Sequence, residues 1–207
     1  MSLPPEPAPG CDLCPRLAAH RRAIRAAHPG WFNGAVASFG STDARLLVLG
    51  LAPGLAGANR TGLPFVGDAS GSLLFPALAA AGFAREGEPP ELHDCMVSNA
   101  VRCLPPGNRP TAAEIRTCRG HLAARIAALP RLCAILCLGR VAHESLIAAL
   151  GARAGAHPFA HGAQHRVAGH AVFDSYHVSR YNVNTGRLSK PMFEAVIAAL
   201  RRYIDAA

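Results

Sequence analysis

Four of the seven cysteines have a spacing that could bind a metal. Cys11 and Cys14 form a Cys-x-x-Cys pair, while Cys103 and Cys118 flank a proline- and glycine-rich stretch. The close pair brings two thiolates to one ion, and two more from a distant segment would complete four-sulfur ligation. Unligated thiols, a zinc ion and an iron–sulfur group all stay open on spacing alone. The wide second spacing favours iron–sulfur, because zinc sites often repeat the close pair. The remaining cysteines lie in apolar runs and are expected in the core: Cys95, Cys133 and Cys137.

A glycine-rich segment, residues 50–71, follows the first short apolar run and contains six glycines. Glycine lets the backbone approach a ligand closely. The segment lacks the Gly-Lys-Ser/Thr of a nucleotide phosphate loop and the dinucleotide fingerprint. Phe65 could stack on a base or fill the core. Asp68 could polarise a water or cap the helix expected near Ser70, and the residues alone favour capping.

A second segment, residues 175–187, is dense in hydrogen-bond donors. His177 could donate a hydrogen bond to developing negative charge. Tyr181 could enter a base stack or lie half-buried in the loop. Side chains that can donate to phosphate oxygens are Ser179, Arg180, Asn182, Asn184, Thr185 and Arg187, and Gly186 allows the backbone to approach closely. This density favours a functional interpretation.

Strands alternating with helices must position these segments. The expected strands are Arg45–Gly50, Cys95–Cys103, Cys133–Gly139 and Ala171–His177. The expected helices are Ser70–Gly82, Thr111–Leu129, residues 140–150 and Ser189–Ile204. This alternation predicts a parallel sheet covered on both faces, with ligands at the carboxyl ends of the strands. We expect one α/β domain.

Composition narrows the class of partner. Half of the 207 residues are hydrophobic and 16% are charged, which is enough apolar surface for a sizeable core. The net charge of +8 favours a polyanionic partner. No apolar run reaches the roughly 18 residues of a membrane span, and no signal-peptide pattern opens the chain. We therefore expect a cytoplasmic protein.

Several motifs together resemble the family 5 (B-type) uracil-DNA glycosylases. They are Gly50-Leu-Ala-Pro-Gly, Gly57-Ala-Asn-Arg-Thr-Gly, Pro64-Phe-Val-Gly-Asp-Ala-Ser-Gly71, Asn99-Ala-Val-Arg-Cys103-Leu-Pro-Pro-Gly-Asn and Tyr176-His-Val-Ser-Arg-Tyr-Asn-Val-Asn-Thr-Gly-Arg187. The resemblance runs from Cys11 to the final helix. Family 4 relatives carry a catalytic Glu where Leu51 stands, which separates this chain from them. Family 5 members often have Pro where Val178 stands.

The resemblance implies a fold and a cofactor. The fold is a three-layer α/β/α sandwich with a central four-stranded parallel sheet, as in the uracil-DNA glycosylase superfamily. It forms a single domain over residues 1–207, in which residues 1–20 are an N-terminal arm tied by a metal cluster. The cofactor is a structural [4Fe–4S] cluster held by Cys11, Cys14, Cys103 and Cys118.

The resemblance also implies a reaction, hydrolysis of the N-glycosidic bond of uracil in DNA to leave an abasic site. Other deaminated bases are expected substrates too. The implied catalytic residues are Asp68 and His177. The implied substrate-binding residues are Gly50, Ala52, Gly54, Phe65 and Asn99. The implied DNA-binding residues are Ser179, Arg180, Asn182, Thr185, Gly186 and Arg187.

Two other classes of protein are alternative interpretations of the sequence. A non-catalytic, metal-stapled module that binds damaged or single-stranded DNA would share the charge, the cysteines and the last loop. It would leave Asp68 and His177 without a role. An iron–sulfur electron carrier is disfavoured by the α/β pattern and the substrate-like loops. We expect a monomer acting on DNA.

Overall fold

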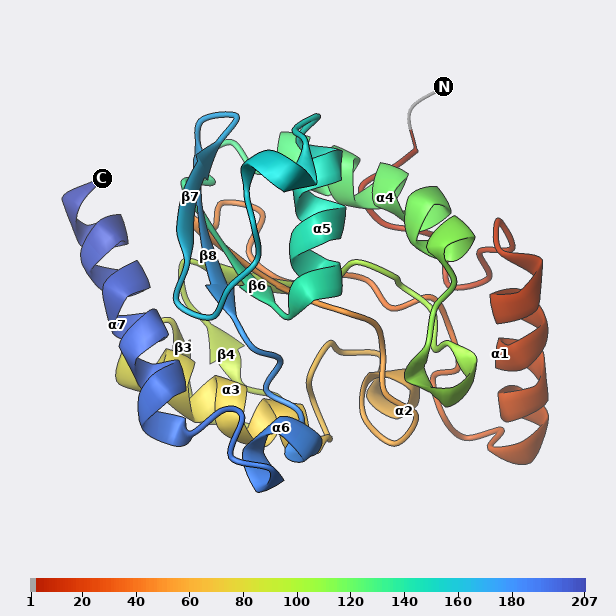
Figure 1. The fold of residues 1–207 in the computed structure, drawn as a ribbon. Coiled ribbons are helices and arrows are strands. Elements are labelled where there is room, and N and C mark those ends of the chain that lie inside the picture. The colour runs from red at the N-terminus through yellow and green to blue at the C-terminus, as the bar shows by residue number, and fades with distance from the viewer. Residues whose placement is uncertain (1–2) are drawn as a thin grey trace.

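A six-stranded sheet forms the centre of the computed structural model, which describes residues 3–207 (Figure 1). Met1 and Ser2, the start of the expected N-terminal arm, lie outside the described residues. The strand order is β1-β5-β2-β6-β8-β7. The strands are β1 (Phe39–Gly40), β2 (Leu46–Gly50), β5 (Cys95–Asn99), β6 (Ala134–Leu138), β7 (Gln164–Val167) and β8 (His170–Ser175). A separate small hairpin pairs β3 (Ala84–Arg85) with β4 (Glu91–Leu92).

The four expected strands are confirmed, and they pair in parallel as β5-β2-β6-β8. The expected count of four is wrong, because β1 and β7 add antiparallel strands at the two edges. Neither edge strand carries an apolar alternation that the sequence could reveal. β1 has two residues, and β7 is largely polar and joined to β8 through Ala168 and Gly169. Both turn residues have positive φ, 48° and 88°, as a tight hairpin requires.

Helices cover both faces of the sheet, which confirms the three-layer arrangement (Figure 1). Successive strand residues point to opposite faces, so Leu46 and Val48 pack with α3 and α7, while Leu47 and Leu49 pack with α4 and α5. The helices are α1 (Pro15–Ala27), α2 (Ala58–Thr61), α3 (Ala69–Ala80), α4 (Ala112–Ala127), α5 (Arg140–Ala149), α6 (Arg180–Asn184) and α7 (Lys190–Ala206), with 3₁₀ turns η1 (Pro106–Asn108) and η2 (Ala154–Ala156). Within residues 3–207, no helix is both long and apolar enough to cross a membrane.

Helix boundaries follow from local chemistry. The four expected helices are present as α3, α4, α5 and α7. α4 begins with the capping box of Thr111 and Glu114, whose side chains bond each other's backbone amides. α1 was not expected; it starts at Pro15, a residue suited to the first helical turn. Residues 15–20, assigned to the arm from sequence, are therefore helical.

The N-terminal segment is fixed by a buried ionic network. Arg102 is 1% exposed, and its Nη1 lies 3.0 Å from Oε2 of Glu6. The other carboxylate oxygen of Glu6 lies 2.8 Å from Arg125, a residue of α4. The backbone amide of Ser38 also donates to Glu6 at 2.9 Å. One carboxylate thus ties the N-terminal segment to α4 and to the segment that follows β5.

This network predicts the effect of neutralising Glu6. Glu6→Gln leaves the buried Arg102 guanidinium without its counter-charge, so we expect the free energy of unfolding to fall by about 2 kcal/mol at pH 7. Burial raises the pKa of Glu6, but Arg102 and the bonds from Ser38 outweigh this and hold it below its usual value. The stabilisation by Glu6 is therefore fully present above the pKa that its carboxyl has in the unfolded chain. It is lost as the pH falls through the lower pKa that this carboxyl has in the folded protein.

Urea unfolding from pH 7 down to pH 3 measures this, and the difference between variant and wild type should shrink with acidification. Glu86→Gln, at an exposed glutamate, is the matched control and should change little. An unfolding free energy of Glu6→Gln equal to that of wild type at pH 7 would contradict the assigned role of the network.

Candidate functional site: a cavity at the carboxyl edge of the sheet

Gly50 brings two functional side chains against the backbone. It ends β2 and lies opposite Asn99, which ends β5, in the parallel register. A Cβ atom at Gly50 would lie 2.5 Å from Cζ of Phe65 and 2.6 Å from Oδ1 of Asn99. The space that a side chain would fill is thus occupied by an aromatic ring and an amide. Any larger residue here would push one of them away.

Phe65 is held in an unusual backbone conformation. Its φ is 64°, a left-handed value that is costly for an aromatic residue, and its side chain is buried. A Cβ at Gly71, in the first turn of α3, would lie 1.9 Å from the carbonyl oxygen of Phe65. The ring is therefore fixed from two sides, by Gly50 and by the packing of Gly71. Such stored strain is typical of ligand sites.

A cavity of about 530 Å³ lies at the carboxyl ends of β2 and β5. Eight of the residues assigned from sequence line it: Ala52, Gly54, Phe65, Asp68, Asn99, His177, Ser179 and Arg180. A larger open groove of about 1040 Å³ shares Gly54, Phe65, Asp68 and Arg180 with this cavity and extends to residues 87–90. The structure therefore brings the two chemistry-bearing loops to one place.

The carboxylate of Asp68 faces two ways. Oδ1 accepts from the backbone amides of Ser70 at 2.9 Å and Gly71 at 3.0 Å, so Asp68 caps α3. Oδ2 lies toward the glycine loop, where a Cβ at Gly54 would be 3.4 Å away and one at Gly57 2.6 Å away. Burial raises the pKa of Asp68, although the two amide bonds oppose the rise. The capping interpretation is confirmed, and it leaves one oxygen facing the cavity.

His177 is neutral at physiological pH, because burial lowers its pKa to about 4. Its carbonyl oxygen accepts from Nδ2 of Asn182 at 2.8 Å. A Cβ at Gly139 would lie 3.3 Å from Cβ of His177, so the turn between β6 and α5 packs directly behind it. A neutral imidazole held in this way has one ring N–H to donate into the cavity.

The last loop uses several of its predicted phosphate donors internally. Ser179 caps the short helix α6 by accepting from the amide of Asn182 at 3.4 Å. Thr185 donates its hydroxyl to the carbonyl of Tyr181 at 2.8 Å. The guanidinium groups of Arg180 and Arg187 lie on exposed residues. Asn182, Thr185, Gly186 and Arg187 do not line the cavity.

Asn108 lines the cavity but was not assigned from sequence. It sits in η1 with a φ of 56°, in the loop that follows β5. The only available signal was its place in that loop beside a glycine. Asn182 likewise has a role that its type does not reveal, since it holds the carbonyl of His177.

The four predicted cysteine ligands gather around one small apolar cavity of about 20 Å³. They come from separate segments: Cys11 and Cys14 before α1, Cys103 after β5, and Cys118 within α4. Burial raises the pKa of Cys103 to about 11 and that of Cys118 to about 12. A bound metal centre would favour the thiolate forms of Cys103 and Cys118 over the thiols that burial favours.

Nitrogen donors already face these sulfur atoms. Nη1 of Arg21, a buried residue of α1, lies 3.2 Å from Sγ of Cys103. The backbone amide of Arg102 donates to Sγ of Cys118 at 3.3 Å. The Nε and Nη2 atoms of Arg102 are buried without a hydrogen-bond partner. Two guanidinium groups thus supply positive charge beside a set of thiols, which suits an anionic sulfur-ligated group.

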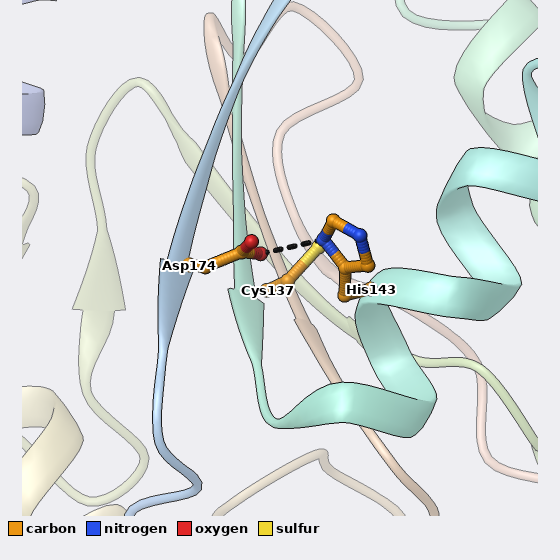
Figure 2. Close-up of side chains that lie close together, drawn as sticks. All are labelled: Cys137, His143 and Asp174. Carbon is orange, nitrogen blue, oxygen red and sulfur yellow. Dashed lines mark hydrogen bonds and ion pairs between the residues drawn. The ribbon is translucent and has the colours of Figure 1, made fainter. Parts of the chain in front are cut away.

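A different group, Cys137, His143 and Asp174, has donor atoms within 4.8 Å of one another (Figure 2). Their composition is compatible with a metal ion, and they come from β6, α5 and β8. In this structure, however, Nδ1 of His143 lies 2.8 Å from Oδ1 of Asp174, and its Nε2 lies 2.8 Å from the carbonyl of His157. Both ring nitrogens face acceptors, an arrangement that favours the doubly protonated ring. Burial lowers the pKa of His143, but the hydrogen bond and charge of Asp174, together with the bond to the His157 carbonyl, outweigh it and raise that pKa above its usual value. The group is a buried ion pair.

The fold and this site define a class: an α/β domain with a cavity at the carboxyl edge of its parallel sheet and a separate cluster of four cysteines. The family model of the Uracil DNA glycosylase superfamily matches residues 37–201. The type-5 uracil-DNA glycosylase of Thermus thermophilus is 43% identical over 205 residues, covering 93% of each chain. That of Pyrobaculum aerophilum is 38% identical, covering 93% of this chain and 87% of the relative.

A type-4 uracil-DNA glycosylase from Pyrobaculum aerophilum is 34% identical over 146 residues, covering 70% of this chain and 63% of the relative. The chain therefore belongs to the uracil-DNA glycosylase superfamily, and within it to the type-5 family. The resemblance read from the motifs is confirmed. The type-4 relative matches over a shorter span than the two type-5 relatives.

The contacts of Gly50 generate a stability prediction. Gly50→Ala places a methyl group within 2.6 Å of Phe65 and Asn99, so we expect the free energy of unfolding to fall by about 1–3 kcal/mol. Gly54→Ala is the matched control, because its Cβ would meet only Asp68 Oδ2 at an ordinary 3.4 Å. Chemical unfolding of both variants measures the difference. Equal stabilities would show that the ring and amide can move away freely.

Proposed function

We propose that this protein hydrolyses the N-glycosidic bond of uracil in DNA and leaves an abasic site. The observation that carries the proposal is the single cavity shared by Phe65, Asp68, Asn99 and His177. The relatives named as uracil-DNA glycosylases support it. They also disfavour the non-catalytic DNA-binding alternative.

The cavity suits an extrahelical base. A glycosylase must take its target out of the stack, at a cost of a few kcal/mol. In the proposed complex, Phe65 stacks on the flipped base. The Asn99 amide carries both a donor and an acceptor, so it can pair with N3 and O4 of uracil. Ala52 and Gly54 line the cavity and provide the close backbone approach, while Gly50 lies against Phe65 and Asn99 and leaves room for both side chains. Tolerance of other deaminated bases is part of the proposal.

The departing base leaves as an anion, and His177 donates a hydrogen bond toward its O2. A neutral donor fits this role, because the pKa of His177, about 4, leaves the ring uncharged in the free enzyme at pH 7. A fixed donor aimed at developing charge is worth roughly 3 kcal/mol of barrier. On the sugar side, Oδ2 of Asp68 orients the attacking water or stabilises the positive sugar.

The last loop holds the DNA backbone. Arg180 borders the cavity and Arg187 lies further along the same segment, and both are exposed cations. The proposed backbone contacts also include Ser179, Asn182, Thr185 and Gly186, whose internal bonds shape the segment. Affinity should then fall with salt, with a slope near one per phosphate neutralised.

A [4Fe–4S] cluster on Cys11, Cys14, Cys103 and Cys118 is the second part of the proposal. Among residues 3–207, no three of these four sulfur atoms lie within 4.8 Å of one another. Tetrahedral zinc, with bonds of about 2.3 Å, would bring sulfur atoms to about 3.8 Å. The wider spacing and the two guanidinium groups favour a larger anionic cluster. When bound, the cluster would cross-link the N-terminal segment to α4 and to the loop after β5.

The remaining assignments are that residues 1–207 fold as one domain, that the protein acts as a monomer, and that it works in the cytoplasm. The net charge of +8 supports DNA as the partner.

Excision of uracil tests the proposed reaction. A duplex with one uracil should yield an alkali-cleavable site, while an undamaged duplex should not. Asp68→Asn keeps an acceptor for the cap of α3 but removes the charge. We expect unchanged unfolding and a single-turnover rate at least tenfold lower.

His177→Ala should also slow excision at least tenfold, with DNA affinity largely kept. No alkali-cleavable product from wild-type protein would reject the reaction. Wild-type rates in both variants would instead remove these two residues from it.

Metal analysis tests the cluster. The purified protein should be brown, absorb broadly near 400 nm and contain iron. Cys118→Ser should lose iron and stability together, whereas Cys95→Ser, a change at a buried cysteine outside the set, should keep its iron. A colourless wild-type protein loaded with zinc would reject the cluster.

A further inference from the structure

A histidine-rich segment, residues 157–165, packs against the end of β8. The amide of Gly162 donates to the carbonyl of Asp174 at 2.8 Å, and the amide of Asp174 donates to the carbonyl of Ala163 at 3.0 Å. The His143–Asp174 ion pair (Figure 2) adds a third tie, because the other ring nitrogen of His143 lies 2.8 Å from the carbonyl of His157. The segment is thus attached to the strand that leads into His177, although it does not line the cavity.

His161 contacts the residue immediately before His177. Its Nδ1 lies 3.2 Å from the backbone nitrogen of Tyr176. That nitrogen is a donor, so Nδ1 accepts and the ring proton is on Nε2. Burial lowers the pKa of His161 from its usual value, which keeps the ring neutral and able to accept. The peptide that joins Ser175 to Tyr176 is thus held at both ends, since its carbonyl oxygen accepts from the amide of Gly139 at 2.8 Å and its N–H faces His161.

The Tyr176 ring lies against three side chains, of which Phe159 is a tilted neighbour with ring centroids 6.3 Å apart. It stacks on the His161 ring, with centroids 5.1 Å apart and planes inclined by 22°. The guanidinium carbon of Arg187 lies 4.7 Å from its centroid. Such a cation–π contact is worth about 0.5–1 kcal/mol at an exposed site. One aromatic ring therefore joins the beginning of the last loop to the arginine at its end.

We propose that His161 and Tyr176 are positioning residues for the glycosylase, with two separable effects. The bond from the Tyr176 amide to Nδ1 of His161 fixes His177 for the chemical step. The stacked rings of His161 and Tyr176 hold the Arg187 guanidinium for DNA binding. This inference rests on the proposed function. It assigns roles to two residues that touch neither the base nor the reacting atoms.

Two substitutions of His161 separate the effects. His161→Phe keeps an aromatic ring but has no acceptor for the Tyr176 amide. His161→Asn keeps an acceptor, because its Oδ1 is attached at the same chain position as Nδ1, but it has no ring. Single-turnover excision with excess enzyme gives the rate of the chemical step. Fluorescence anisotropy with an abasic-site duplex gives the dissociation constant.

We expect opposite patterns. His161→Phe should slow excision about tenfold and keep its affinity, since a small displacement of a reacting group is costly. His161→Asn should keep its rate and bind DNA about threefold more weakly. Tyr176→Leu should weaken binding similarly, and no further in the Arg187→Ala background, because both changes remove one contact. Tyr176→Phe keeps the ring and should bind like wild type.

Arg202→Ala removes an exposed charge from the last part of α7 and is the control for loss of net charge. Parallel losses of rate and affinity in both His161 variants, or wild-type values in both, would overturn the proposal. If the losses of DNA affinity in Tyr176→Leu and Arg187→Ala add up in the double variant, the proposal is also overturned. This comparison of single and double variants decides the matter alone if a His161 variant does not fold. Absence of uracil excision by wild-type protein is a distinct result, which rejects the proposed function itself.

Discussion

The candidate site depends on the register between β2 and β5, which ends both strands at the same level with Gly50 opposite Asn99. Because Gly50 has no side chain, the ring of Phe65 and the amide of Asn99 can both reach the backbone there. A slip of one residue would exchange the side chains of β2 between the two helical layers, so the packing on both faces of the sheet fixes this register. The core therefore determines the position of the site.

Charge is distributed so that the buried parts of this basic protein remain balanced. Arg102 is buried against Glu6 on one side and close to the Cys118 sulfur on the other. Arg21 faces Cys103 in the same region. Across the sheet, the buried charge of Asp174 is balanced by His143. Arg180 and Arg187, by contrast, belong to an exposed segment where an added polyanion can reach them.

Much of the fold follows from local sequence patterns, and the parts that do not have identifiable physical reasons. The parallel strands were predictable because fully buried strands read as short apolar runs, as Leu46–Gly50 does. The edge strands were not, because β1 has only two residues and β7 is mostly polar, so neither reads as an apolar run. Helix α1 was missed because it begins at Pro15, and a proline is equally typical of an irregular arm.

The members of the site were predictable by motif, but their individual contacts were not. Asp68 was expected to cap a helix or to act on water; the structure gives each oxygen a different neighbour, which no residue type could indicate. Asn182 looked like a phosphate donor, yet its amide is bonded to the His177 carbonyl. Asn108 reaches the cavity through a left-handed turn in η1. Each case depends on tertiary contacts between segments far apart in the chain.

The neutral state of the His177 ring connects the electrostatics of the cavity to the proposed chemistry. A cationic His177 would lie beside Arg180, another lining residue of the cavity, and two positive charges there would repel each other before DNA arrives. Burial prevents this, because it lowers the pKa of His177 to about 4. The ring still carries one N–H, and a hydrogen bond from a neutral donor strengthens as negative charge grows on its acceptor. The donor thus favours the departing anion over the intact nucleotide, and this difference in interaction, rather than tight binding of the substrate, is what lowers a barrier.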